Sequence, residues 1–231
     1  MKTCTVIIPA YGVEKWINDC INAFKKQKPL DGWRYEIVVG IDGCEKTAKA
    51  IKTSYWWSPQ NVGVYVMLNS LVSVIDTDLY AFFGADDIPF SNYLRTAIPV
   101  AEKYGFTKVR GIQCDENLNP YKKSKNKVKG QSLFKKEVIE KLGGFYFYKT
   151  SCDTDFRNRA YIEGYDWKKA IKMFDSPLFY RRNHKNSLTK SKKTGIKSEY
   201  RLNVKKKMKE EFDKGIVKIE PQKTYLEYRR I

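Results

Sequence analysis

The chain has 231 residues and a formal net charge of +18, with 42% hydrophobic and 14% aromatic residues. This content suffices for one hydrophobic core, so we expect one domain with a C-terminal extension. No run approaches the roughly 20 apolar residues of a membrane span, the start lacks a secretory leader, and the five cysteines are scattered. These features exclude a transmembrane segment and predict a soluble cytoplasmic protein; peripheral association with a membrane stays open.

The N-terminal part of the chain alternates between buried strands and helices. A β-branched run ending at Pro9 predicts a buried strand, and apolar residues spaced three and four apart over 16–24 predict an amphipathic helix. A second apolar run over 36–41 predicts a strand, and the segment through Ala48 a helix. This order predicts an α/β protein with a parallel sheet. Ligands of such sheets bind outside the carboxyl ends of the strands.

Two adjacent carboxylates, Asp86 and Asp87, end the apolar run that begins at Leu79. Carboxylates at the tip of a buried strand are costly unless a positive group neutralises them, and a divalent metal is the usual solution. The alternative is that both residues form a turn before Pro89 and cap a helix that begins near Ser91.

Short motifs follow one another in a fixed order over residues 3–190. They are Val6–Tyr11, Asp42-Gly43-Cys44, Asn61 with Gly63 and Asn69, Asp86-Asp87, Gly130–Glu137, Gly143-Gly144-Phe145, Asp153, and Tyr180–Ser187. The series resembles the family-2 glycosyltransferases of the GT-A fold. The resemblance implies a GT-A (Rossmann-like), mainly parallel twisted sheet flanked by helices. We expect this domain to span residues 1–190, with residues 191–231 forming a basic helical extension packed on it.

The resemblance also implies a role for individual residues in the transfer of a sugar from a nucleotide diphosphate sugar, with a UDP-sugar favoured. Asp87, together with His184, is expected to hold Mn²⁺ or Mg²⁺. Asp153 is expected to be the general base of an inverting transfer, with Asp155 as its close rival. The residues expected to bind the nucleotide sugar are Pro9, Tyr11, Asp42, Asn61, Gly63, Asp86, Arg181 and Arg182.

Several of these residues also have a plainer interpretation. Tyr11 could be an ordinary half-buried aromatic side chain, and Asp42 could form a turn with the glycine after it. Asp153 could cap a helix, which does not exclude a role as base. His184, the single histidine of the chain, could be an unremarkable surface residue.

Three positions depart from the family pattern. Ile41 and Gly84 stand where an acid is usual, and Leu68 stands where an Arg is frequent. Because this Arg is absent, the identity of the nucleotide sugar that serves as the donor stays open. The departures also support a rival of another class, a non-catalytic nucleic-acid-binding protein on a degenerate transferase fold.

The positive charge is concentrated in two segments. From Arg181 to the end of the chain there are 17 Lys and Arg against 6 Asp and Glu, and residues 122–129 contain no acid. Such clusters attract polyanions, so we expect a polyanionic acceptor and favour a hydroxymethylated base in DNA. A cell-envelope glycan or a lipid-linked acceptor at an anionic membrane surface is the alternative, and a merely solvated lysine-rich surface is the plainest one. The lysines expected to bind the acceptor are Lys122, Lys123, Lys125, Lys127, Lys129, Lys205, Lys206 and Lys207.

The last quarter of the chain contains a helical pattern. Tyr200, Val204, Met208 and Phe212 recur every four residues among lysines, which predicts a basic amphipathic helix over 197–212. We expect its apolar stripe to pack on the domain rather than to lie in a membrane.

Overall fold

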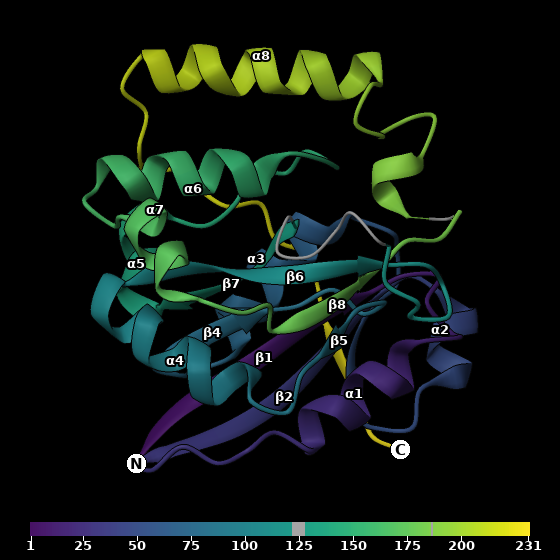
Figure 1. The fold of residues 1–231 in the computed structure, drawn as a ribbon. Coiled ribbons are helices and arrows are strands. Elements are labelled where there is room, and N and C mark those ends of the chain that lie inside the picture. Colours follow the sequence, from purple (N-terminus) through teal and green to yellow (C-terminus); the bar gives the residue numbers. More distant parts are fainter. Residues whose placement is uncertain (122–127, 186) are drawn as a thin grey trace.

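The computed structural model describes residues 1–121, 128–185 and 187–231 (Figure 1). The strands are β1 (Lys2–Ala10), β2 (Trp33–Asp42), β3 (Tyr55–Ser58), β4 (Leu79–Phe82), β5 (Ile88–Pro89), β6 (Phe106–Cys114), β7 (Val128–Lys135), β8 (Phe179–Arg182) and β9 (Glu227–Arg229). The helices are α1 (Ile17–Lys25), α2 (Glu45–Ala50), α3 (Val64–Val74), α4 (Tyr93–Tyr104), α5 (Lys136–Leu142), α6 (Cys152–Ile162), α7 (Trp167–Ala170) and α8 (Glu199–Asp213), with short 3₁₀ turns at Ile171–Met173 and Leu188–Lys190.

In the described part of the chain the strands form one nine-stranded sheet in the order β5-β8-β6-β7-β4-β1-β2-β3-β9. The first four strands in the chain pair in parallel, with β1 between β2 and β4. The α/β class and the flanking helices agree with the sequence prediction. The sheet is more mixed than expected, because β7 runs antiparallel to both β4 and β6.

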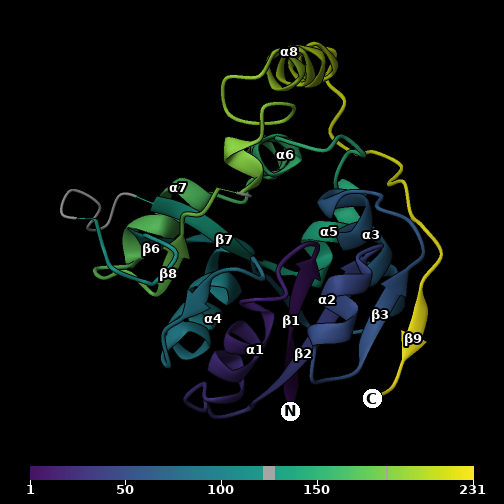
Figure 2. The same ribbon diagram turned by 90° about the vertical axis from the view of Figure 1, so that its right-hand side faces the viewer.

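The two faces of the sheet carry separate apolar cores. Successive side chains of a strand point to opposite faces, and in β1 Val6 and Ile8 pack in one cluster while Ile7 packs in the other. Helices α1 and α4 cover the first face, and α3, α5 and α6 cover the second (Figure 2).

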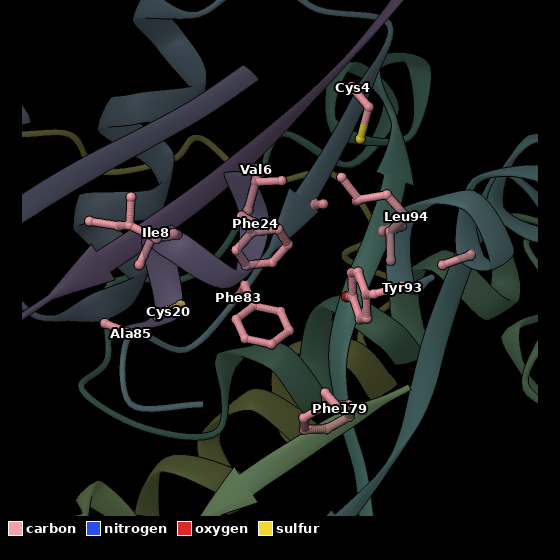
Figure 3. Packing of buried hydrophobic residues seen from close by; sticks show 14 of the residues in the cluster. Cys4, Val6, Ile8, Cys20, Phe24, Phe83, Ala85, Tyr93, Leu94 and Phe179 are labelled. Atoms are coloured by element: carbon pink, nitrogen blue, oxygen red, sulfur yellow. The ribbon is translucent and has the colours of Figure 1, made fainter. Parts of the chain in front are cut away.

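An edge-to-face row of aromatic rings supports the end of β4. The Phe83 ring lies 4.8 Å from the Phe24 ring and 5.3 Å from the Tyr93 ring, both at close to a right angle (Figure 3). The Phe83 amide also donates to the Ile7 carbonyl of β1, at 3.0 Å. The loop with Asp86 and Asp87 therefore begins from a fixed position.

The C-terminal part of the chain packs over α6 and then runs along one side of the molecule to the edge of the sheet (Figure 2). Helix α8 buries Val204 and Met208 of the predicted stripe over α6, while Tyr200 stays 41% exposed. Beyond α8 the chain forms β9, which pairs antiparallel with β3 (Figure 2). The end of the chain is thus an edge strand, which the prediction of a helical extension did not include.

In the part of the chain that the structure describes, no helix combines the length and the apolar character that crossing a bilayer would require.

Candidate functional site

A cleft of about 640 Å³ opens at the carboxyl ends of β1 and β4. Its lining combines acidic, amide and basic side chains from distant parts of the chain. Those that enter the chemical argument are Asp86, Asp87, Lys108, Gln131, Asp153, Arg181, Arg182, Arg201 and Lys205.

The Asp87 carboxylate is buried, with 5% of the residue exposed. One of its oxygens accepts from the Arg182 amide at 2.9 Å, and the other from the Gln131 side chain. Burial raises the pKa of Asp87 well above its usual range, and the charge of Asp86 adds to this effect. A bound cation would stabilise the ionised form of a carboxylate in this environment.

Residues at the end of β8 and just after it bind the loop that contains Asp86 and Asp87, which we call the carboxylate loop. The Arg182 guanidinium donates to the Asp86 carbonyl at 2.9 Å, and His184 Nε2 lies 2.8 Å from Asp86 Oδ2. The His184 ring also packs against Trp16, with a centroid distance of 4.2 Å. Arg182 Nη2 and His184 Nδ1 are buried without a partner in the described structure. The structure therefore brings His184 and Arg182 to the carboxylates, and His184 Nε2 is engaged by Asp86.

Gln131 reaches Asp87 because of a β-bulge. Lys108 of β6 pairs with Ser132, but the next residue, Val109, pairs with Gly130, so Gln131 has no partner in β6. Its backbone φ is 35°, an unusual value for a residue with a side chain. The Gln131 amide donates to Asp87 and accepts from the Gly84 amide at 3.1 Å. Bulges often re-aim a side chain in this way.

The residues at the carboxylate loop fit a divalent cation. A Cβ on Gly84 would lie 3.2 Å from Asp86 Oδ1 and 3.3 Å from Asp87 Oδ2, so the glycine leaves open the space between these oxygens. The described residues contain no preassembled group of three or more His, Cys, Asp and Glu side chains for a metal. Mg²⁺ commonly uses one or two carboxylates and takes its other ligands from substrate phosphates and water.

Asp42 and Tyr11 lie at the ends of neighbouring parallel strands. Asp42 is a buried residue, 4% exposed, and its carboxylate accepts from the amides of Val62 and Gly63 at 2.7 and 2.9 Å. Burial raises the pKa of Asp42, and the two amides oppose this rise. Asp42 thus fixes the loop that contains Asn61, whose side chain lies 3.4 Å from the Asp42 carbonyl. Tyr11 is 58% exposed.

Of these predicted nucleotide-binding residues, the structure brings one group into the cleft and leaves another outside its lining. Pro9, Asp86, Arg181 and Arg182 line the cleft. Tyr11, Asp42, Asn61 and Gly63 lie outside that lining, on the neighbouring strand ends and loop, as far as the described residues define it.

Asp153 faces the cleft from the first turn of α6. Tyr65 donates to its Oδ1 at 2.9 Å, and Lys108 Nζ lies 3.7 Å from its Oδ2. Desolvation would raise the pKa of Asp153, but Lys108 and the Tyr65 hydroxyl outweigh it and hold this pKa below its usual value. The side chain is 49% exposed. Asp153 is therefore ionised at neutral pH and open to a substrate.

Asp155, two residues further on, faces the interior. Its carboxylate accepts from Arg159 at 2.7 Å, and this arginine also donates to the carbonyls of Leu142, Gly144 and Val217. Two residues along a helix turn the side chain by about 200°. Asp155 therefore belongs to a buried structural network.

The basic residues expected to bind an acceptor fall into three groups. Lys122, Lys123, Lys125 and Lys127 lie outside the described residues. Lys129 lies on β7. On α8, Lys205 lines the cleft, whereas Lys206 and Lys207 are exposed outside that lining and Lys207 lies over the Tyr148 ring.

The sequence analysis does not assign five residues to the site that the structure brings there: Trp16, Tyr65, Lys108, Gln131 and Arg201. For Trp16 the sequence indicates only a place on an apolar helix face. A signal existed for Lys108, because a lone lysine between the apolar residues Phe106 and Val109 is unusual in a buried strand. The role of Gln131 depends on a bulge, for which the sequence carried no signal.

The sequence profile described as Glycosyl transferase family 2 matches residues 5–169. No curated protein sequence matches the chain.

Solved structures with a similar fold include S. aureus TarS 1-349 in complex with UDP-GlcNAc, at a TM-score of 0.58 and 17% identity over 81% of this chain and 60% of that one. TarS 1-349 alone gives a TM-score of 0.57 at 17% identity over 79% of this chain and 60% of that one. The mannosyltransferase PcManGT from Pyrobaculum calidifontis, in complex with GDP-Man and Mn²⁺, gives 0.56 at 18% identity over 70% and 52%. The chain thus spans about 60% of the length of TarS 1-349.

Proposed function

Because this chain belongs to glycosyl transferase family 2, we propose that it transfers a sugar from a nucleotide diphosphate sugar to a hydroxyl group, with inversion at the anomeric carbon. The observation that carries the proposal is that three carboxylates face one cleft: the buried Asp87, the partly buried Asp86 beside it, and the ionised, half-exposed Asp153. Asp86 and Asp87 are suited to bind a cation and, through it, a diphosphate. Asp153 is suited to accept a proton.

In the proposed reaction Asp153 accepts the proton of the acceptor hydroxyl. The hydroxyl oxygen forms a bond to the anomeric carbon, and the bond from that carbon to the diphosphate breaks. Tyr65 and Lys108 hold the carboxylate in position and keep it ionised. Arg181 and Arg182 line the same cleft and would balance the charge of the departing nucleoside diphosphate.

Asp86 Oδ1 and Asp87 Oδ2 would hold Mn²⁺ or Mg²⁺, with His184 as a further predicted ligand. The cation, when bound, supplies charge to stabilise the leaving diphosphate. Gln131 and Arg182 fix the orientation of Asp87.

The nucleotide is predicted to be uridine diphosphate, held by Tyr11, Asp42, Asn61 and Gly63 beside Pro9. Support comes from the position of Tyr11 and Asp42 at strand ends on the same edge of the parallel sheet as the carboxylate loop, and from TarS, whose structure contains UDP-GlcNAc. The GDP-Man in PcManGT makes guanosine diphosphate the rival.

A thermal-shift panel tests the donor. A ligand at 100 times its dissociation constant adds about 2.7 kcal/mol to the free energy of unfolding. We expect UDP-GlcNAc or GDP-mannose to raise the melting temperature only with Mn²⁺ or Mg²⁺ present. If no nucleotide diphosphate sugar shifts it with metal, the enzyme proposal fails.

For the acceptor we put a polyanion first, with a hydroxymethylated base in DNA as the specific version. Binding to duplex DNA should weaken linearly with the logarithm of salt concentration, with a slope of about −0.9 per phosphate contact. Changing Lys122, Lys123, Lys125 and Lys127 to Gln should flatten this slope. If the protein binds anionic vesicles instead of DNA at about 50 mM salt, the membrane-surface acceptor is favoured.

The non-catalytic alternative makes a different prediction. A nucleic-acid-binding protein on this fold would bind DNA without responding to nucleotide sugar and metal. Slow hydrolysis of the nucleotide sugar in water, which needs only the donor site, would exclude it.

A further inference from the structure

Asn69 belongs to the ordered motifs of the sequence, yet the proposed transfer gives it no task. It lies on α3 and is only 4% exposed, so its amide is buried between this helix and the segment that joins α5 to α6. A buried amide is costly unless its polar atoms form hydrogen bonds. The partners of Asn69 therefore indicate its role.

Asn69 binds the backbone of Phe145 with both of its polar atoms. Its Oδ1 accepts from the Phe145 amide at 2.9 Å, and its Nδ2 donates to the Phe145 carbonyl at 2.7 Å. The same Nδ2 lies 3.3 Å from the carbonyl of Gln222, in the C-terminal segment. The two bonds to one residue fix both the position and the direction of Phe145 relative to α3.

The C-terminal segment supports this arrangement from outside. A Cβ on Gly143 would overlap the Ile219 carbonyl oxygen, so the two backbones are in direct contact. The Thr224 amide donates to the Oγ of Ser70 on α3, at 2.8 Å. Residues 219–224 lie beyond the region that the family profile matches. A segment outside that region therefore holds α3 and the turn before Phe145 together.

The Phe145 ring lies between the two helices that share the Asp153 hydrogen bond. It stacks on the Phe156 ring of α6, at 4.5 Å, and lies 5.5 Å from the Tyr65 ring of α3. Phe156 follows Asp153 by three residues on α6, and Asn69 follows Tyr65 by four on α3, so each pair is adjacent on its helix surface. Phe145 therefore sets the spacing of α3 and α6 where Tyr65 reaches Asp153.

We propose that Asn69 is a positioning residue for the general base Asp153. By holding Phe145 between α3 and α6, it keeps the Tyr65 hydroxyl on the Asp153 carboxylate, where the bond is 2.9 Å long. The inference rests on the proposed transferase function, since only that reaction gives Asp153 the task of a base.

The surroundings of Asp153 make this effect measurable. Burial would raise the pKa of Asp153, but Lys108 of β6 and the Tyr65 hydroxyl of α3 lower it. Arg157, on the same helix as Asp153, lowers it further. Of these three groups only Tyr65 lies on α3. Loss of the Asn69 bonds should therefore raise the pKa of Asp153 by removing the Tyr65 contribution, while the two cations keep theirs.

Carbon-13 NMR of the full chain with labelled aspartate measures this pKa, and Asp153→Asn identifies the signal. We expect Tyr65→Phe, which removes the hydroxyl, to raise the pKa of Asp153. Asn69→Ala should shift it in the same direction. The double variant should match Tyr65→Phe alone, because no further bond to Asp153 remains to be lost.

Asn18 provides the matched control for the loss of a bridging amide. It lies on α1, on the other face of the sheet, where it donates to the Ala50 carbonyl at 2.8 Å and accepts from the Lys52 amide at 3.0 Å. Asn18→Ala should lower the melting temperature, as Asn69→Ala does, and leave the pKa of Asp153 at the wild-type value. A general loss of stability is thereby separated from a loss of position.

Phe145→Leu tests the same step if Asn69→Ala does not fold. It keeps the backbone bonds to Asn69 and removes the ring contacts with Tyr65 and Phe156, so it should also raise the pKa of Asp153.

An unchanged pKa of Asp153 in Tyr65→Phe, in folded Asn69→Ala or in Phe145→Leu would overturn the inference. So would a double variant whose pKa lies well above that of Tyr65→Phe, because Asn69 would then act through another group.

The donor experiment separates this inference from the proposed function. Absence of any nucleotide-sugar shift in the wild-type protein would defeat the transferase proposal, whatever the titration of Asp153 shows. A normal donor shift together with an unchanged titration in Asn69→Ala would defeat the positioning role alone.

Discussion

The acidic groups of the site come from the ends of β2 and β4, the two strands that flank β1 in the sheet, whereas the basic side of the cleft takes its groups from segments that meet only in the folded chain. Asp42 and Asp87 are buried and held by backbone amides. Lys205 is exposed on α8 and Asp153 is half exposed. The acidic side is therefore rigid and suited to a ligand of fixed geometry, and the basic side can adapt to a long, variable acceptor.

The largest expected effect comes from the half-exposed base. Asp153→Asn should reduce turnover by roughly 10²- to 10⁴-fold, because the amide cannot accept the hydroxyl proton. Donor affinity should stay close to the wild-type value, which a thermal shift with nucleotide sugar and Mn²⁺ measures.

The neighbouring carboxylate provides the control for Asp153. Asp155→Asn breaks a buried ion pair with Arg159, so it should lower the free energy of unfolding by about 3–5 kcal/mol while the folded fraction keeps its turnover. If the Asp155→Asn variant has no transferase activity and the Asp153→Asn variant is active, the two assignments are reversed.

The next largest effect on turnover is expected at Asp87, on the rigid acidic side of the site. Asp87→Asn removes a charged oxygen from the predicted cation site, so turnover should fall by about 10²- to 10³-fold and the metal-dependent thermal shift should disappear. The control is Asp76→Asn, at a side chain that is 89% exposed and distant from the cleft. Full metal-dependent turnover in Asp87→Asn would return Asp87 to the role of a turn residue.

A smaller effect is expected at the bulge. Gln131→Ala leaves Asp87 without one of its two donors, and the loss of such a supporting partner usually weakens metal binding by about 10- to 100-fold. Titration of Mn²⁺ by electron paramagnetic resonance measures this directly. Gln222→Ala, at an exposed side chain in the C-terminal segment, should bind Mn²⁺ like the wild type. Unchanged Mn²⁺ affinity in Gln131→Ala would show that the backbone amide of Arg182 alone fixes Asp87.

The smallest expected effect is a gradual change with pH in the stability that Mn²⁺ adds to the protein. The folded protein holds the Asp87 proton to a higher pH than the unfolded chain, whose Asp pKa is about 3.9. Between these two pKa values the native state binds more protons, so this group makes the metal-free protein less stable as pH rises. Mn²⁺ competes with that proton, and the stabilisation by Mn²⁺ should therefore grow with pH. Melting curves with and without Mn²⁺ across this range, repeated on Asp87→Asn, test the sign.

The sequence by itself determined the elements that follow local rules. The β-branched run before Pro9, the spacing of apolar residues over 16–24, and the stripe around Val204 and Met208 predicted β1, α1 and α8. The apolar run that begins at Leu79 also placed Asp86 and Asp87 at a strand end. Because the carboxyl ends of parallel strands meet at one edge of the sheet, this position predicted that both residues lie at the ligand-binding edge. The family resemblance rested on the same local motifs.

Only the tertiary structure decided which residues share the cleft. Asp153 and Asp155 are alike in sequence, but the turn of α6 directs one to the cleft and the other to the buried Arg159. The bulge that aims Gln131 at Asp87 depends on the register between β6 and β7. Lys108, Arg181 and Lys205 meet because α8 packs over α6, and no local pattern encodes a contact between such distant segments. Local periodicity fixes the elements, whereas the side chains that meet at a site are set by packing between them.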